Sequence, residues 1–453
     1  MRTGARHQQQ QIAEGAGLPT HIPTLDGWRA LAIVAVICFH GRFAFFPHSS
    51  IVRSISEYGY LGVDAFFAIS GFLICTLLIR EYDANQSINL RAFYVRRFFR
   101  IIPPYVAALV GICLVAWLGF IHLQSWEIPG CLLFLRNYEP TVAPPGGPYD
   151  PSGFYTVHFW SLSLEEHFYL IWPSLLAFLR PRRAVKAALI LAVTVVLWRY
   201  VDGHYQIMHR LMPSAEMGTR TDSRLDALLW GCLAALLFPR IQSIFSHRLW
   251  SWAWIPLSLY LVLLERYHLP LFQLQLAVLF PCLLMSTVLF PPSFLSRALE
   301  LPWVRWIGAM SYSIYLWQQL FLQPPRGAGS LEQTSGFYRL QQFPFNLFCI
   351  LVCACVSHYL LERPMMQFGR RFSSRKPIPS EGVVPVPGQP AQPALGSTAI
   401  LDARGRAVSC TLRPRYFHLF GAADTTCGAT RRDFHDRLPN PVTTNCSSVT
   451  EKP

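Results

Sequence analysis

Ten apolar runs constrain the fold of this 453-residue chain more than any other feature of its sequence. A helix needs about 20 apolar residues to cross the roughly 30 Å hydrocarbon core of a bilayer, where it satisfies its own backbone hydrogen bonds. We therefore predict an all-α, polytopic membrane protein with about ten transmembrane helices. The runs lie near residues 28–46, 60–79, 103–122, 156–179, 185–201, 225–238, 249–265, 270–290, 304–323 and 342–361.

Charged residues are scarce and mostly basic. They make up 14% of the chain, whereas a soluble domain has about 25%, so the sequence excludes an ordinary water-soluble protein. The 39 Lys and Arg residues against 25 Asp and Glu residues give a net charge of +14. In a soluble protein this excess indicates nucleic-acid binding, but in a membrane protein basic residues gather in cytoplasmic loops. We expect membrane lipids among the partners and no nucleic acid.

The basic residues also predict the topology. Loops on one side, at 80–100, 180–186, 240–248 and 297–305, hold about twice as many Arg and Lys residues as the loops on the other side. Such loops stay in the cytoplasm, and an even number of spans places both termini there too. We expect a multi-pass protein of the cell's inner (plasma) membrane.

Composition divides the chain into three parts. Residues 1–24 are polar and lack the apolar core of a cleaved signal peptide, which predicts a cytoplasmic N-terminal segment. Residues 25–368 hold every apolar run and form the predicted transmembrane domain. Residues 369–453 are rich in Pro, Ser and Thr without periodicity, which predicts a disordered cytoplasmic tail. The twelve cysteines show no metal-ligand spacing, and we predict no metal site.

Ionisable side chains within the runs are functional candidates, because they are costly in lipid. Arg29 and His40 lie eleven residues apart in the first run, which places them about 16 Å apart along one face of a helix. Arg29 then lies near the cytoplasmic surface with Asp26 as an ion-pair partner, and His40 lies deeper. Arg29 is either a ligand-binding group or a topology anchor, and His40 is either catalytic or a hydrogen-bonded core residue.

The second run adds Asp64 and Ser70. Counting from the cytoplasmic ends places Ser70 near the depth of His40, with Asp64 within a couple of helical turns. A carboxylate or hydroxyl beside an imidazole fixes the tautomer that a general base needs. The alternative interpretation is polar contact between helices.

Two further clusters carry charge. Arg97 and Arg100 face the same way ahead of the third run, where two guanidinium groups suit either a phosphate-bearing ligand or anionic lipid headgroups. Glu165 and Glu166 are followed by His167 at the expected outer start of the fourth run, and packing alone does not explain two acids there.

These segments together resemble the acyltransferase 3 family, multipass enzymes that O-acylate carbohydrates and related cell-surface molecules. The resemblance covers about 25–365. Its pieces are Leu25-Asp26-Gly27-Trp28-Arg29 with His40, Gly62-Val63-Asp64-Ala65-Phe66-Phe67 with Ser70-Gly71-Phe72, Arg97-Phe98-Phe99-Arg100, Trp160-Ser161-Leu162 with Glu165, Arg224-Leu225-Asp226-Ala227, Ser311-Tyr312-Ser313-Ile314-Tyr315-Leu316-Trp317 and Leu361-Glu362-Arg363-Pro364.

The resemblance implies a site and its substrates. Acyl-CoA, by default acetyl-CoA, would be the cytoplasmic donor, no cofactor would stay bound, and a hydroxyl of an extracytoplasmic glycan or glycolipid, such as a surface polysaccharide or lipopolysaccharide, would be the acceptor. The catalytic candidates are His40, Asp64 and Glu165, the acyl-CoA-binding candidates are Arg29, Arg97 and Arg100, and the supporting candidates are Ser70, Glu166, Arg224 and Asp226.

Two departures from the family pattern and two competing functions stay open. This chain has Gln318 where the family often has His, and His167 where the family favours Gln. A transporter or channel would use the same charges as a permeation or proton path, and an inactive scaffold would use them for binding alone. The acyl chain, the acceptor and the oligomeric state are not specified by the sequence.

Overall fold

The computed structural model describes residues 22–45, 49–139, 153–245, 248–267, 269–289, 293–322, 336–373, 400–401 and 407–408. The chain divides into two units, 1–377 and 378–453. In the second unit the described residues are two short antiparallel strands, β1 (Ile400–Leu401) and β2 (Ala407–Val408). Nearly all of the N-terminal segment predicted at 1–24, and most of the tail predicted at 369–453, lie outside the described residues.

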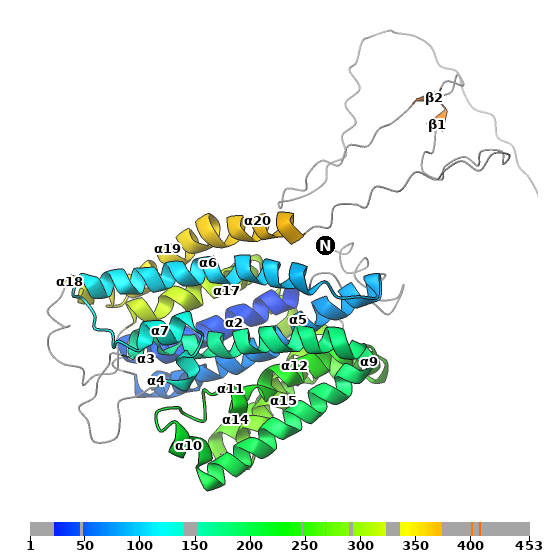
Figure 1. Cartoon of the computed structure of the whole chain (residues 1–453), viewed down its shortest axis with the longest axis horizontal. Coiled ribbons are helices and arrows are strands. Elements are labelled where there is room, and N and C mark those ends of the chain that lie inside the picture. The colour runs from blue at the N-terminus through cyan, green and yellow to red at the C-terminus, as the bar shows by residue number, and fades with distance from the viewer. Residues whose placement is uncertain are drawn as a thin grey trace, which may run out of the picture. The chain divides into compact units, whose positions relative to one another are not determined.

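The described part of the first unit is helical (Figure 1). Its longer helices are α2 (Pro23–His40), α5 (Leu61–Asn85), α6 (Leu90–Trp117), α9 (Phe159–Tyr205), α12 (Asp226–Leu236), α14 (Trp254–Tyr267), α15 (Phe272–Val288), α17 (Pro302–Phe321), α19 (Phe345–Ser357) and α20 (Arg363–Ser373). Between them lie α3 (Arg42–Phe45), α4 (Ser50–Glu57), η1 (Tyr58–Tyr60), α7 (Glu127–Leu132), η2 (Arg136–Tyr138), α8 (Phe154–Val157), α10 (Ile207–Leu211), α11 (Thr221–Arg224), α13 (Phe238–Ile244), η3 (Arg248–Trp252), α16 (Phe294–Leu299), α18 (Gly336–Leu340) and the π-helix η5 (His358–Glu362).

Each of the ten apolar runs coincides with helix, so the all-α prediction is confirmed for the described residues of the first unit. Four helical stretches are long and apolar enough to cross a membrane, and a fifth joins them if α12 and α13, which meet at a 64° bend, count as one span. The four are Ser50–Asn85, Leu90–Trp117, Phe154–Tyr205 and Phe345–Ser373. The count of ten spans and the side of the termini stay predictions.

The long helix α9 consists of two legs. Arg180 lies between them with φ of 62°, a left-handed conformation that breaks the helix, and Pro181 follows it. Figure 1 shows the two legs meeting at one end of the unit and running back at an angle to each other. The sequence predicted separate helices at 156–179 and 185–201, and the break between them falls where the structure turns.

Glycines let the central helices approach closely. A Cβ added to Gly62 of α5 would collide with the Ala32 carbonyl oxygen of α2, and one added to Gly59 would collide with that of Ala35. Residue numbers thus increase along α5 as they decrease along the adjacent part of α2. The two helices are therefore antiparallel neighbours with a fixed register. Such glycine-mediated contacts are typical of helix packing in membranes.

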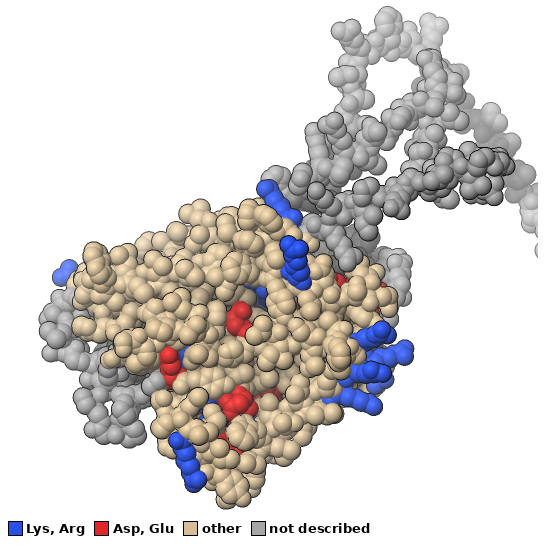
Figure 2. Space-filling view, viewed as in Figure 1, with Lys and Arg blue, Asp and Glu red and all other residues tan. Residues whose placement is uncertain are grey.

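The outer surface of the first unit matches a lipid environment. Figure 2 shows a broad face with few charged side chains, while Lys and Arg gather near the end where α9 turns. Large apolar side chains point outward, such as Phe178 and Trp117, which are 84% and 80% exposed. The exposed basic residues at the turn of α9 are Arg180, Arg182, Arg183 and Lys186.

Candidate functional site

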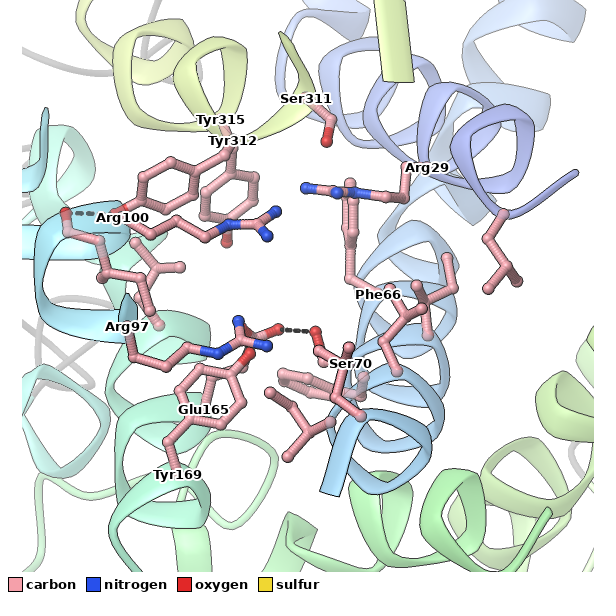
Figure 3. A pocket seen from close by; sticks show the side chains of 18 of the residues that line it. Arg29, Phe66, Ser70, Arg97, Arg100, Glu165, Tyr169, Ser311, Tyr312 and Tyr315 are labelled. Atoms are coloured by element: carbon pink, nitrogen blue, oxygen red, sulfur yellow. Dashed lines mark hydrogen bonds between the residues drawn. The ribbon is translucent and has the colours of Figure 1, made fainter. Parts of the chain in front are cut away.

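A cavity of about 290 Å³ lies between α2, α5, α6, α9 and α17, and we call it the arginine cavity (Figure 3). Arg29 enters it from α2, and Arg97 and Arg100 enter it from α6. The sequence analysis proposed these three residues as one binding set, and the structure brings them together. Other polar side chains in the lining are Asp26, Ser70, Thr76, Arg80, Ser161, Glu165, Glu166, Tyr169, Ser311, Tyr312 and Tyr315.

The three guanidinium groups have no paired acid. Among the residues that the structure describes, none of Arg29, Arg97 and Arg100 forms an ion pair. The Arg97 guanidinium instead lies 5.0 Å from the centre of the Tyr169 ring. Three cations in one cavity repel one another, so the arrangement favours a ligand that carries several negative charges.

Glu165 lies near these arginines, but its hydrogen bonds are to neutral donors. Ser70 donates a hydrogen bond of 2.9 Å to one carboxylate oxygen, and Tyr169 donates one of 2.7 Å to the other. Figure 3 shows the bond from Ser70 across the floor of the cavity, with Arg97 beside it. Both oxygens of Glu165 are therefore engaged, and the arginine heads stay exposed to the cavity.

The packing of α6 fixes where its two arginines point. Asn89 caps the helix by accepting a hydrogen bond of 2.9 Å from the backbone N–H of Ala92. Phe99, between the two arginines in sequence, packs its ring 5.2 Å from that of Phe368 on α20. Because Phe99 is turned toward α20, Arg97 and Arg100 are left to face the cavity.

A second cavity, of about 250 Å³, contains His40, and we call it the histidine cavity. His40 lies at the C-terminal end of α2, whose earlier residue Arg29 lines the arginine cavity. One helix thus contributes a side chain to each of the two cavities. The remaining polar or aromatic lining residues are Phe39, Tyr60, Asp64, His158, Trp160, Arg224, Phe272, Gln273 and Tyr315.

Charges around the histidine cavity are paired. Asp64 forms a buried ion pair of 2.5 Å with Arg224. Behind it, Asp226 pairs with Arg199 at 2.6 Å, and Arg199 also donates to the Gln273 side chain at 2.8 Å. The sequence singled out Asp64, Arg224 and Asp226 separately, but it missed Arg199 and the pairing itself.

His158 is a second buried imidazole, which the sequence analysis missed. It lines the same cavity as His40 and is 1% exposed. Neither of its ring nitrogens makes a hydrogen bond of good geometry within the described chain, and Nδ1 of His40 is likewise without one. The signal was a histidine among the first residues of the fourth run predicted at 156–179, a place where a membrane-interface residue is equally common.

Three expectations about position are wrong. Ser70 lies in the arginine cavity and not at the depth of His40, because the antiparallel register of α2 and α5 carries Ser70 toward Arg29. Glu165 and Glu166 line the arginine cavity too, although the sequence analysis expected the acids on the outer side of the imidazole.

Other predicted contacts also differ. Asp26 forms an ion pair of 3.9 Å with Arg305, a partner that the sequence analysis did not name. His167 points away from the acids next to it and contacts the Thr221 hydroxyl through Nδ1 at 2.7 Å. Glu362, quoted above in the last family segment, is bound by His358 at 2.7 Å and by Ser313 at 2.9 Å. It lies within electrostatic range of Arg29 and Arg100.

Val63 and Tyr315 line both cavities. The two cavities are therefore neighbours separated by these side chains, with cations on one side and imidazoles on the other. No group of three or more metal-binding side chains lies together in the described ranges.

Comparison with known proteins identifies the family. A family model described as an acyltransferase domain, acyltransferase 3, matches residues 22–363. The chain belongs to this family. The match includes both cavities and every site residue discussed above. No solved structure matches the chain.

Several relatives are similar to this acyltransferase-family chain. A peptidoglycan O-acetyltransferase of Listeria monocytogenes, OatA, is 29% identical over 325 residues, which is 66% of this chain and 49% of the relative. A putative peptidoglycan O-acetyltransferase of Bacillus subtilis, YrhL, is 27% identical over 79% of this chain and 56% of its own. An O-acetyltransferase of Staphylococcus aureus, OatA, is 28% identical over 78% and 58%. The chain thus spans about half the length of these relatives.

Proposed function

We propose that this chain is a membrane O-acyltransferase that moves an acyl group, acetyl in the first instance, from cytoplasmic acyl-CoA to a hydroxyl of an extracytoplasmic carbohydrate. The proposal includes ten spans, both termini in the cytoplasm and a place in the inner (plasma) membrane. The names of the relatives support acetyl as the acyl group and a glycan such as peptidoglycan as the acceptor.

One observation carries the proposal: a cavity with three arginines that form no ion pair among the described residues adjoins a cavity that contains His40, whose Nδ1 makes no hydrogen bond of good geometry within the same residues. Coenzyme A carries several phosphate charges, and guanidinium groups bind phosphate through paired N–H donors. A donor held by Arg29, Arg97 and Arg100 would extend its thioester toward the boundary at Val63 and Tyr315. His40 lies on the other side of this boundary, in the histidine cavity.

His40 would act as the general base. Its unprotonated ring nitrogen takes the proton of the acceptor O–H while that oxygen attacks the thioester carbonyl carbon. The new C–O bond forms, the C–S bond breaks, and the thiolate of coenzyme A leaves and takes the proton back from the imidazolium. The products are an acyl ester and free coenzyme A. A two-step route, in which His40 first accepts the acyl group itself, stays open.

The acids take supporting roles in this scheme. Asp64 and Arg224 neutralise each other beside His40, which keeps a net charge away from the imidazole. Glu165 lies with the donor and not with His40, so we place it in orienting the donor end of the site. Glu166 lines the same cavity, and Asp226 supports the Asp64–Arg224 pair from behind through Arg199.

The test uses the purified full-length chain in detergent with acetyl-CoA and a soluble peptidoglycan fragment. We expect release of the coenzyme A thiol together with formation of an acetyl ester on the fragment. Both should be lost in His40→Ala, and both should be strongly reduced in Arg100→Gln when acetyl-CoA is below its wild-type KM. The matched controls are His209→Ala and Arg183→Ala, because both side chains are exposed and neither lines a cavity described above.

Transport or scaffolding predicts other results. Solute flux through proteoliposomes without thiol release, unchanged by His40→Ala, would contradict an enzyme and support a transporter. Acetyl-CoA binding that is lost in Arg100→Gln, with no ester formed by the wild-type chain on any glycan offered, would support a scaffold.

A further inference from the structure

Tyr315 is held rigidly at the boundary between the cavities. Its hydroxyl lies 2.6 Å from the Ser161 Oγ and donates a hydrogen bond of 2.7 Å to the main-chain carbonyl of His158. Its ring meets the Phe66 ring edge-on at 6.3 Å and the His158 ring at 5.4 Å. Because both the hydroxyl and the ring of Tyr315 make contacts, a change of its rotamer would break them.

The same face of α17 carries polar groups on both sides of Tyr315. Ser311, four residues before it, lines the arginine cavity, and Gln318, three residues after it, lies beside His40. Residues at these spacings share one helix face. The Ser311 hydroxyl and both amide atoms of Gln318 are buried and make no hydrogen bond of good geometry among the described residues, although Gln318 lies close enough to interact with the His40 imidazole.

Unpartnered buried polar groups are costly, so their alignment requires an explanation. A thioester that travels along this face would supply a carbonyl oxygen for such donors, first near Ser311 and then near Gln318. The face thus connects the donor phosphates to the imidazole and passes Tyr315 on the way.

We propose that Tyr315 and Val63 form the constriction through which the acyl group reaches His40, and that this constriction restricts the donor to short acyl chains such as acetyl. The inference rests on the proposed function and adds the class of donor to it. A rigid aromatic wall excludes extra methylene groups because overpacking a fixed site is unfavourable. One methylene group in an apolar site is commonly worth about 10- to 200-fold in discrimination.

The experiment compares acetyl-CoA with butyryl-CoA as donors for the purified full-length chain and the same glycan fragment. The quantity is the ratio of kcat/KM for butyryl to that for acetyl. We expect a low ratio for the wild type, and a rise of at least about tenfold in Tyr315→Ala and in Val63→Ala. Val63→Ala widens the passage without touching the hydrogen bonds of Tyr315, so it covers the case in which Tyr315→Ala does not fold.

Two variants serve as controls on the mechanism. Tyr315→Phe keeps the ring and loses its two hydrogen bonds, and we expect a ratio between those of the wild type and Tyr315→Ala. Tyr312→Ala removes a tyrosine that lines the arginine cavity alone, and we expect the wild-type ratio.

The outcomes separate this inference from the proposed function. A wild-type chain that uses butyryl-CoA as well as acetyl-CoA overturns the constriction, as does an unchanged ratio in both Tyr315→Ala and Val63→Ala. An equal rise in Tyr312→Ala overturns it too, because discrimination would then lie in the donor cavity at large. No acyl transfer by the wild type from either donor instead overturns the proposed function.

Discussion

The arginine cavity and the histidine cavity are neighbours, but they differ in whether their charged side chains form ion pairs. In the first, Arg29, Arg97 and Arg100 face the space without an ion-pair partner in the described chain. In the second, the ion pair of Asp64 with Arg224 leaves no uncompensated charge between those two side chains. Unpaired charge in a low-dielectric region is unfavourable until a ligand compensates it, whereas paired charges compensate each other in the empty protein.

This difference in ion pairing indicates which ligand or reaction step each cavity suits. Three arginines without an ion-pair partner among the described residues suit a polyanion that binds and leaves, and imidazoles suit a proton that is taken and returned. Variants in the two cavities should therefore change different kinetic constants, kcat for the histidine cavity and KM for the arginine cavity.

The largest effect is expected at the imidazole. His40→Ala removes the proposed general base, a contribution that is typically about 10²–10⁴-fold in rate. We expect kcat for acetyl transfer to fall by that factor while KM for acetyl-CoA stays near its wild-type value. Steady-state kinetics with varied acetyl-CoA measures both constants. A parallel rise in KM would place His40 in donor binding and would remove the distinction between the cavities.

The next effect concerns stability. Arg224→Ala leaves Asp64 as an unpaired buried carboxylate, and breaking a buried pair in this way costs about 3–5 kcal/mol. We expect a clear drop in the thermal unfolding midpoint of the detergent-solubilised chain. The double variant Arg224→Leu with Asp64→Leu should recover most of the loss, because neither charge remains. If the single variant is as stable as the wild type, the pair does not support the histidine cavity.

The features that the sequence predicted correctly are those within one helix. Arg29 and His40 lie on α2, and the rise of a helix sets their separation whatever surrounds it. Arg97 and Arg100 likewise lie on α6, three residues apart. For such pairs, spacing in the sequence is already distance in the structure.

The errors all involve two helices. The depth of Ser70 relative to His40 depends on the register of α5 against α2, which close contacts at Gly59 and Gly62 set and which no single helix reveals. Asp64 and Arg224 are 160 residues apart, so their pairing follows from packing alone. Glu165 was expected at the outer end of the fourth run because of its position in the sequence. The sequence did not reveal that this part of α9 lines the same cavity as the arginines.

A substitution of Arg100 tests whether the arginine cavity binds the donor. Arg100→Gln removes one charged donor to phosphate, and hydrogen bonds to charged groups contribute about 1.5–3 kcal/mol. We expect KM for acetyl-CoA to rise about 10- to 100-fold with little change in kcat, and Arg183→Ala to leave both constants unchanged. Titration of acetyl-CoA binding to the chain without acceptor provides an independent measurement. Unchanged donor affinity would mean that the cavity does not bind the phosphates of coenzyme A.

The smallest expected effect tests why Glu165 leaves the arginines unpaired. Ser70→Ala removes one of the two hydrogen bonds that hold its carboxylate, worth about 0.5–1.5 kcal/mol. The freed oxygen then turns toward Arg97 and competes with the donor, so KM for acetyl-CoA should rise about two- to tenfold while kcat stays constant. Tyr169→Phe removes the other bond and should act in the same direction. If either variant lowers kcat and leaves KM unchanged, Glu165 takes part in the chemical step, and the division between a donor cavity and a reaction cavity fails at this residue.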